Sequence, residues 1–265
     1  MAAHPTLPDV VLPRHRPVMH ADSSANRRHV RAATVETLPD VVEQKYTFAA
    51  HALTELLDWA EYALDPDASH PEGVINSLYY DTPDLLMYRQ KRSSEYLKCK
   101  VRLRWYSTTP LGEGVPCYLE VKRKAGSTRH KRRSTIHVPP DSLADGLFQC
   151  NIIAAASDQA QQNGYPEHSV MLPVAHVQYR RRRYTDPGTG ARIAIDWDIS
   201  CPAVNTDVVP AEPPVWLPRG VLEVKAPLRH LPSSLDPLAF LLHKTSFSKY
   251  AQCLEQLMYP EGVRI

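Results

Sequence analysis

The chain has 265 residues, of which 43% are hydrophobic and 23% are charged. This composition is typical of a globular protein with a sizeable core, and it excludes a wholly disordered chain. No run of apolar residues approaches the ~20 that a membrane-spanning helix needs, so we expect no membrane-spanning helix. The net charge is only +2, which excludes a uniformly basic surface.

In chain order, the alternation and spacing of apolar residues predict the following elements. Strands are expected over residues 41–48, 74–80, 96–105, 117–123, 130–138, 175–184, 191–199 and 220–226. Helices are expected over residues 49–64, 85–91, 141–162, 237–243 and 246–258. Residues 1–40 show no hydrophobic period and predict a disordered lead, which leaves residues 41–265 as one domain of the α+β class.

Basic residues are concentrated in one part of the chain. Between Arg89 and Arg133 there are fourteen Lys or Arg and three Asp or Glu, a local balance of +11 in a chain whose total is +2. The rest of the chain must therefore be net acidic. This asymmetry indicates an anionic partner, whether nucleic acid, phosphate or a membrane surface.

The five cysteines carry a weaker signal. They show neither CxxC nor Cys/His metal spacing, and their number is odd. Together with the absence of an apolar signal segment near residue 1, this pattern predicts reduced thiols in a cytoplasmic protein.

Charges recur at every second position on one face of several predicted strands, and the opposite faces are apolar. The charged sets are Glu43 and Lys45; Lys98, Lys100, Arg102 and Arg104; Glu120, Lys122 and Lys124; Arg192 and Asp196; and Glu223 and Lys225. Either an ordinary sheet exposes this face to water, or the sheet closes into a barrel with the charges inside. Basic residues stacked in this way repel one another, which favours a wet interior that holds an anion.

The acidic residues within these sets allow two interpretations. Glu120 and Glu223 could each form an ion pair with a neighbouring lysine. Alternatively, a carboxylate among cations could hold a divalent metal that bridges to bound phosphates. Neither a P-loop nor an HExxH motif is present.

A series of short motifs in a fixed order resembles the VTC domain, the catalytic module of polyphosphate polymerases in the triphosphate tunnel metalloenzyme superfamily. The motifs are E-x-K (Glu43, Lys45), S-L-Y-Y-D-T (Ser77–Thr82), K-V-R-L-R-W-Y (Lys100–Tyr106), L-E-V-K-R-K (Leu119–Lys124), K-R-R (Lys131–Arg133), Y-R-R-R-R-Y (Tyr179–Tyr184), R-I-A-I-D (Arg192–Asp196), L-E-V-K (Leu222–Lys225) and F-S-K-Y (Phe247–Tyr250). Each motif alone is weak, and the resemblance, which covers about residues 41–259, depends on their number and order.

The resemblance implies an eight-stranded antiparallel β-barrel tunnel with flanking helices. It also implies transfer of the ATP γ-phosphoryl group to a growing inorganic polyphosphate chain, assisted by Mn²⁺ or Mg²⁺, with no nucleic acid or membrane as partner. The catalytic residues that it implies are Lys45, Arg102, Arg104, Lys122, Arg181 and Arg192. The further phosphate-binding residues are Lys100, Lys131, Arg133, Lys225 and Lys249, and the metal ligands are Glu223 and Glu120.

Alternatives stay open at several of these positions. The run Arg180–Arg183 could be a nonspecific basic patch, and Lys249 could lie on the surface of a C-terminal helix. The sister CYTH-type tunnel enzymes begin with E-x-E-x-K, whereas Val41 replaces the first acid here. A tunnel poorer in acid favours holding a long polyanion over activating water. A triphosphatase that hydrolyses tripolyphosphate or a nucleoside triphosphate and a non-catalytic polyanion-binding module are the rival functions.

Overall fold

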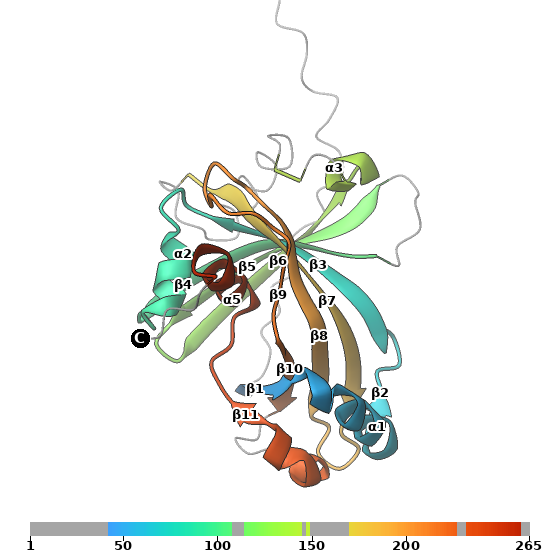
Figure 1. Cartoon of the computed structure of the whole chain (residues 1–265). Coiled ribbons are helices and arrows are strands. Elements are labelled where there is room, and N and C mark those ends of the chain that lie inside the picture. The colour runs from blue at the N-terminus through green and yellow to red at the C-terminus, as the bar shows by residue number, and fades with distance from the viewer. Residues whose placement is uncertain (1–41, 108–113, 145–146, 149–169, 227–231, 261–265) are drawn as a thin grey trace, which may run out of the picture. The chain divides into compact units, whose positions relative to one another are not determined.

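The structure is a computed structural model that describes residues 42–107, 114–144, 147–148, 170–226 and 232–260. Its main feature is an antiparallel sheet in which eight long strands are joined by three two-residue strands (Figure 1). The strands are β1 (Val42–Ala49), β2 (Asp65–Pro66), β3 (Glu72–Asp81), β4 (Leu97–Tyr106), β5 (Val115–Ala125), β6 (Thr128–Val138), β7 (Leu172–Thr185), β8 (Arg192–Val204), β9 (Val215–Trp216), β10 (Arg219–Ala226) and β11 (His243–Lys244). Their order in the sheet is β11-β1-β10-β8-β7-β3-β4-β5-β6, with β2 paired to β7 and β9 paired to β8.

The helices are short and few among the described residues. They are η2 (Ala50–Ala52), α1 (Leu53–Ala63), α2 (Leu86–Arg92), α3 (Pro140–Ala144), η3 (Ser233–Leu241) and α5 (Lys249–Met258), of which η2 and η3 are 3₁₀ helices. The domain is therefore of the predicted α+β class, with a large antiparallel sheet.

Alternation gives strands such as β4 and β5 one apolar and one charged face. In β4, Val101 and Leu103 are fully buried, and they pack in one cluster with Leu119 and Val121 of β5. The residues between them project from the opposite face, because successive side chains of a strand point to opposite sides. In β4 and β5 the apolar residues thus lie on one side of the sheet and the basic residues on the other.

Helix α1 covers part of the apolar side. Leu56 and Ala60 are buried on its inward face, in one cluster with Phe48 of β1, Ile195 of β8 and Leu222 of β10. The packing is close, since a Cβ at Gly220 would lie 2.0 Å from the ring of Phe48. A glycine is therefore required at this position of β10.

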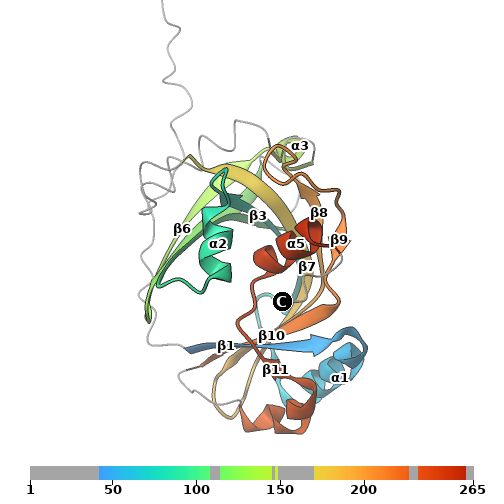
Figure 2. The same ribbon diagram turned by 60° about the vertical axis from the view of Figure 1, so that its left-hand side comes forward.

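Helix α5 packs on the other side, near one end of the sheet. Tyr250 stacks on Tyr79 of β3 with ring centroids 5.0 Å apart. Leu254 and Leu257 extend the same cluster to Val177 and Ile199. In both ribbon views α5 lies beside α2 (Figures 1 and 2).

A buried carboxylate joins these two helices to the sheet. Asp81, the last residue of β3, accepts hydrogen bonds from the backbone amides of Thr82 (2.8 Å), Met87 (2.8 Å) and Tyr88 (3.0 Å) and from the Tyr250 hydroxyl (2.8 Å). These four bonds fix α2 and α5 to the end of β3. Burial nevertheless raises the pKa of Asp81 above its ordinary value.

The eight predicted strands correspond to the eight long strands, with ends that differ by a few residues. The predicted helix over residues 141–162 is confirmed at residues 141–144, which lie in α3, and is wrong at residues 147–148, which form a turn; its other residues lie outside the described ranges. Residues 237–243 were expected to form a helix, and the 3₁₀ helix η3 begins earlier, at Ser233. The predicted lead, residues 1–40, lies outside the described residues.

The sheet is strongly curved (Figure 2), and a cavity lies on its charged side. Its two terminal strands are β11 and β6, and no pairing joins them among the described residues. The part of the predicted tunnel that the structure confirms is the antiparallel sheet with its few helices. No helix in the described ranges is long and apolar enough to cross a membrane.

Candidate functional site: a cavity lined by lysine and arginine

The cavity on the charged side of the curved sheet has an empty volume of about 470 Å³. Eight basic and two acidic residues line it, which gives the lining a formal charge of +6. The basic residues are Lys45, Lys100, Arg102, Arg104, Lys122, Arg181, Lys225 and Lys249; the others are Glu43, Glu223, Tyr79, Tyr179 and Ser248. They come from β1, β3, β4, β5, β7 and β10 and from the N-terminal end of α5.

Register brings these charges together from distant parts of the chain. Lys45 of β1 lies opposite Glu223 of β10, and Glu43 lies opposite Lys225. Residues that pair across antiparallel strands share a face of the sheet. The two E-x-K motifs, 180 residues apart, therefore form a square of alternating charge at one side of the cavity.

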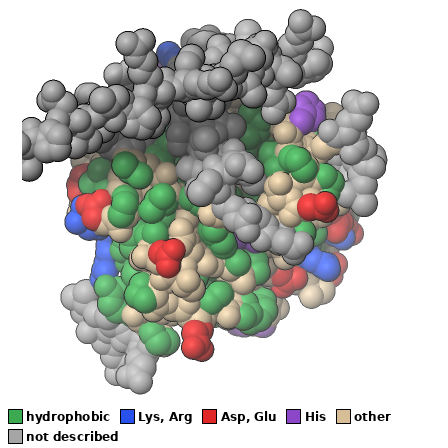
Figure 3. Space-filling view, turned by 90° about the horizontal axis from the view of Figure 1, so that it is seen from above, with side chains coloured by type: hydrophobic (Ala, Val, Ile, Leu, Met, Phe, Trp, Pro, Cys, Tyr) green, Lys and Arg blue, Asp and Glu red, His purple; other side chains and the backbone are tan. Residues whose placement is uncertain are grey.

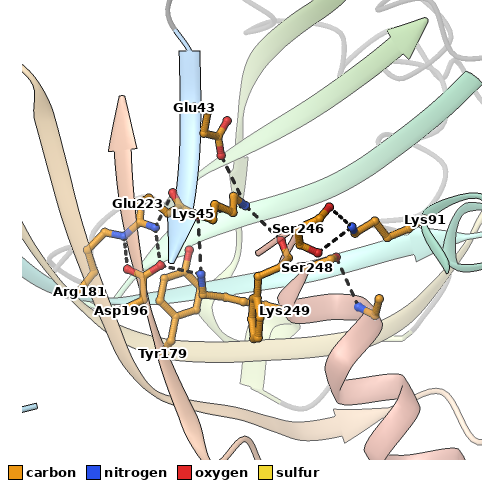
Figure 4. Close-up of polar contacts among 12 residues, drawn as sticks. Glu43, Lys45, Lys91, Tyr179, Arg181, Asp196, Glu223, Ser246, Ser248 and Lys249 are labelled. Carbon is orange, nitrogen blue, oxygen red and sulfur yellow. Dashed lines mark hydrogen bonds and ion pairs between the residues drawn. The ribbon is translucent and has the colours of Figure 1, made fainter. Parts of the chain in front are cut away.

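The most buried part of the cavity is an ion-pair network around Asp196 of β8 (Figure 4). Arg181 donates to Asp196 through Nε (2.5 Å) and Nη2 (2.6 Å), and Lys249 donates to its Oδ2 at 2.5 Å. Asp196 is 0% exposed, and the two cations are each 7% exposed. Burial disfavours the ionised carboxylate, but Arg181 and Lys249 together hold the pKa of Asp196 below its ordinary value.

Glu223 continues the network toward β1. Its Oε2 accepts from Arg181 Nη2 at 3.3 Å, and its Oε1 lies 3.2 Å from the Lys45 ammonium and 3.9 Å from that of Lys249. Despite burial, Lys45 and then Arg181 hold the pKa of Glu223 well below its usual range. Glu223 is thus ionised and shared among three cations.

At the outer end of the network, Lys45 contacts Glu43 at 3.4 Å and donates to the Phe247 carbonyl at 3.3 Å. Burial opposes ionisation of Glu43, but Lys45, Lys122 and Lys225 together outweigh it and lower the pKa of Glu43 to about 2. Lys91 of α2 donates to the carbonyl (2.9 Å) and the hydroxyl (2.7 Å) of Ser246 (Figure 4). These contacts hold the segment before α5 beside the cavity.

A second ion-pair centre lies on β4, β5 and β6. Arg102 donates to Glu120 Oε2 through Nε at 2.7 Å, and Lys131 lies 3.2 Å from Oε1. Arg104 approaches the same carboxylate at 4.0 Å. Glu120 is 3% exposed and is absent from the lining, so it serves as the internal counter-ion of Arg102.

Lys100 and Lys122 differ from the residues of the two ion-pair centres. They lie opposite each other on β4 and β5, so two like charges meet across the strands. The Lys100 ammonium lies 4.7 Å from the centroid of the Tyr79 ring. Burial, followed by repulsion from Arg102, lowers the pKa of Lys100 well below its ordinary value. The same two causes lower the pKa of Lys122 to about 7. This part of the cavity therefore favours a ligand that brings negative charge.

The structure brings most of the predicted site residues together. Of the predicted catalytic residues, Lys45, Arg102, Arg104, Lys122 and Arg181 line the cavity. Of the predicted phosphate-binding residues, Lys100, Lys225 and Lys249 line it, as does the predicted metal ligand Glu223. Lys249 is buried and bound to Asp196, so the alternative of a surface lysine is wrong.

Four predicted residues lie outside the lining. Arg192 is exposed at the first position of β8, opposite Lys225. Lys131 and Glu120 contact each other on β6 and β5, and the Arg133 guanidinium lies 3.7 Å from the centroid of the Tyr118 ring. Arg180 and Arg182, the neighbours of Arg181, form exposed ion pairs, so the arginine run alternates between cavity and surface. In the view of Figure 3, hydrophobic and uncharged side chains cover most of the described surface and basic ones are few.

Sequence reasoning missed the role of Asp196 and the cavity positions of Tyr79, Tyr179 and Ser248. Asp196 had been placed on the charged face with Arg192 but not assigned to the site. Its partners Arg181 and Lys249 stand 15 residues before and 53 residues after it, so no spacing within one strand indicates them.

The lining has two carboxylates that could hold a divalent metal, Glu43 and Glu223. Among the described residues no group of three or more His, Cys, Asp or Glu is placed to bind a metal ion. Mg²⁺ is commonly held by one or two carboxylates together with substrate phosphates and water. These two carboxylates fit a metal site that phosphates complete, and Glu120, which is absent from the lining, does not belong to it.

The curved sheet and its cation-lined cavity define an anion-binding domain of the kind that handles phosphates. Residues 40–258 match the model of the VTC domain, and the chain belongs to this family, which is a triphosphate tunnel family of phosphate-handling enzymes.

Solved structures show a distant likeness. A candidate adenylyl cyclase from Hippeastrum, described as having a dominant triphosphatase activity, is 14% identical, with 83% of this chain and 97% of that chain covered and a TM-score of 0.41. A candidate adenylate cyclase from Vibrio parahaemolyticus is 12% identical, with 81% and 97% covered and a TM-score of 0.42. One from Bacillus halodurans is 10% identical, with 70% and 79% covered and a TM-score of 0.40. No curated protein matches the chain.

Proposed function

We propose that this domain is a polyphosphate polymerase, which transfers the γ-phosphoryl group of ATP to an inorganic polyphosphate chain bound in the cavity. The observation that supports the proposal is the lining itself, where eight basic residues from five strands of the sheet and α5, among them Arg102, Arg181 and Lys249, face two carboxylates. Lys and Arg bind phosphate oxygens strongly, and Arg can do so through two parallel hydrogen bonds.

Phosphoryl transfer requires mainly bound, positioned phosphates and positive charge, and this lining can provide both. Phosphoryl transfer depends on holding donor and acceptor in line and on neutralising charge on the transferred group. Arg102, Arg104 and Lys122 would bind one phosphate group, and Arg181, Lys225 and Lys249 would bind its neighbour from the facing strands and α5. The terminal phosphate of the acceptor is already ionised, so no general base is needed.

Glu223, with Glu43 beside it, would hold Mn²⁺ or Mg²⁺. The metal would supply neutralisation of charge on the donor phosphates when bound. Ion pairing with Lys45 keeps both carboxylates ionised, and Glu43 has a pKa of about 2, so the ligands are ready at neutral pH.

One feature favours transfer to phosphate over transfer to water. The other buried carboxylates near the cavity, Asp196 and Glu120, are bound by arginine and lysine and are not available to orient a water. The closed tunnel implied by the family is part of the proposal. It is supported by the lining, because residues of the paired strands β1 and β10 and residues of the paired strands β4 and β5 surround the same cavity.

The test is an incubation of purified protein with ATP and Mn²⁺, followed by gel electrophoresis with polyphosphate staining and an assay of released phosphate. A ladder of products supports the polymerase. Free phosphate without a ladder identifies a triphosphatase, and binding without turnover identifies a polyanion-binding module.

Glu223→Ala is expected to abolish turnover, by more than about 100-fold, because it removes the central metal ligand. Binding of tripolyphosphate should persist in part, since the cations remain. Glu61→Ala removes an exposed carboxylate of α1 that contacts Arg182 and serves as the control. Full activity in Glu223→Ala would refute the metal assignment.

Binding of tripolyphosphate is expected to weaken as the pH rises above about 7, by up to about tenfold per pH unit. The reason is Lys122, whose pKa of about 7 leaves it largely neutral in the empty cavity above that pH. A bound anion favours the charged form, so binding at higher pH must take up a proton. Calorimetry in two buffers of different ionisation enthalpy measures this uptake.

Lys122→Arg is the matched variant for that experiment, because arginine stays charged throughout the range. It should bind without the proton uptake, and its affinity should be flatter between pH 7 and pH 9. An unchanged pH profile in this variant would show that another group titrates.

A further inference from the structure

A row of three basic side chains extends the cavity lining outward along the sheet. Register places Lys98 of β4 opposite Lys124 of β5, and Lys124 opposite Arg129 of β6. The next row inward contains Lys100 and Lys122, which line the cavity. Residues two apart in a strand share a face, so the outer row and the cavity cations lie on the same side of the sheet.

Nothing within the described ranges neutralises this outer row. None of its three members forms an ion pair with an acidic residue there, in contrast to Arg102, which is bound to Glu120. Neighbouring strands are about 5 Å apart, so the three cations repel one another, and like charges placed directly opposite are destabilising. Lys91 of α2 also feels them, since its pKa is lowered by burial and then by Lys98, Lys45 and Lys124.

We propose that the row formed by Lys98, Lys124 and Arg129 binds the phosphates of a linear polyphosphate chain that extend beyond the cavity. The inference rests on the proposed function and assigns that site a preference for long chains. The rows are about 7 Å apart along the strands, and flexible lysine side chains can span that distance. Successive phosphates of one chain could then pass from Lys100 and Lys122 to the outer row without leaving basic side chains.

A linear polyphosphate fits this row better than a nucleic acid does. Proteins that bind single-stranded nucleic acid combine basic grooves with several aromatic side chains that stack on the bases. The outer row consists of two lysines and an arginine on adjacent strands, and a chain of phosphates asks for nothing else.

The test compares two ligands of different length, sodium tripolyphosphate and size-fractionated long-chain polyphosphate. In the triple variant Lys98→Gln, Lys124→Gln, Arg129→Gln, affinity for the long chain is expected to fall about tenfold, because three exposed ion pairs are lost. Affinity for tripolyphosphate should stay within about twofold, which also shows that the variant is folded. The triple variant Arg180→Gln, Arg219→Gln, Lys244→Gln removes three exposed charges outside the cavity lining and is the control for net charge.

Each outcome decides between the proposals. An equal loss for both ligands, or an equal loss in the control variant, would overturn the outer row as a chain-binding surface. A larger loss of single-stranded DNA binding than of polyphosphate binding would assign the row to nucleic acid and would also overturn it. If the protein shows no turnover but its binding of long-chain polyphosphate still depends on these three residues, the outer row is supported as a binding surface and the polymerase is refuted. Wild-type protein that binds neither polyphosphate would refute the proposed function itself.

Discussion

Replacing Asp196 with asparagine is expected to lower the free energy of unfolding by about 3–5 kcal/mol, the range for breaking a buried ion pair by removal of one partner. Asp196 is fully buried and accepts charged hydrogen bonds from both Arg181 and Lys249. Asparagine has nearly the same shape but carries no charge, so two cations would be left in a buried site with only Glu223 to neutralise them. Urea denaturation followed by circular dichroism measures the difference.

Asp198→Asn provides the control two residues further along β8. The Asp198 side chain is 66% exposed and lies 3.7 Å from Arg180, so its loss should change stability by less than about 0.5 kcal/mol. A similar loss in both variants would show that the network around Asp196 contributes no particular stability.

Ligand and pH provide two further readouts for Asp196. Tripolyphosphate should stabilise Asp196→Asn more than it stabilises the wild type, because its oxygens can replace the missing carboxylate near Arg181 and Lys249. The pKa of Asp196 is lower in the folded state than in the unfolded state, so its contribution is present above the unfolded value and is lost as the pH falls toward the folded value. The difference between wild type and variant should therefore shrink below about pH 4.

Asp81→Ala is expected to lower the free energy of unfolding by about 3–5 kcal/mol through a different mechanism. It removes the acceptor of three backbone amides and of the Tyr250 hydroxyl, and each buried donor left without a partner costs about 1–3 kcal/mol. The total is smaller than the sum of the four separate costs, because the structure can relax and water can hydrogen-bond to some of the freed donors. Thermal or chemical unfolding measures the effect.

The same substitution should affect the cavity, because Asp81 holds α5 through Tyr250, and the preceding residue, Lys249, lines the cavity. We expect weaker tripolyphosphate binding at temperatures where the variant is still folded. Asp84→Ala is the control, since Asp84 is exposed and its contacts among the described residues are with Thr82 and Arg89. Unchanged ligand affinity in folded Asp81→Ala would show that α5 keeps its position without this carboxylate.

The strands and their charged faces were predictable because one face of each packs in the core and the other does not. A period of two then appears directly in sequences such as those of β4 and β5. Register across the sheet was not predictable, and it decides which cation meets which carboxylate. Glu120 shows the difference, since its neighbour Lys122 was a plausible partner, whereas the structure pairs it with Arg102 of β4 and Lys131 of β6.

Predictions from the local sequence pattern were also less accurate where they did not include the packing of the segment against the rest of the domain. The residues after Pro140 have helical composition, and residues 141–144 are helical, but residues 147–148 form a turn. Arg192 shares its face with cavity residues, but it occupies the first position of β8 and is exposed there. Alternation specifies the face on which a side chain lies, and it does not specify the distance of that side chain from the cavity.

The carboxylates inside the domain have a consequence for discrimination among anions. Four of the lining cations contact carboxylates of the domain. Arg181 and Lys249 contact Asp196, Lys45 contacts Glu223 and Glu43, and Arg102 contacts Glu120. An incoming anion must compete with these fixed negative groups, and a singly or doubly charged ion such as sulfate or orthophosphate offers too little charge to displace several of them at once. Condensed phosphates present many closely spaced oxygens, so we expect the site to bind them in preference to small buffer anions.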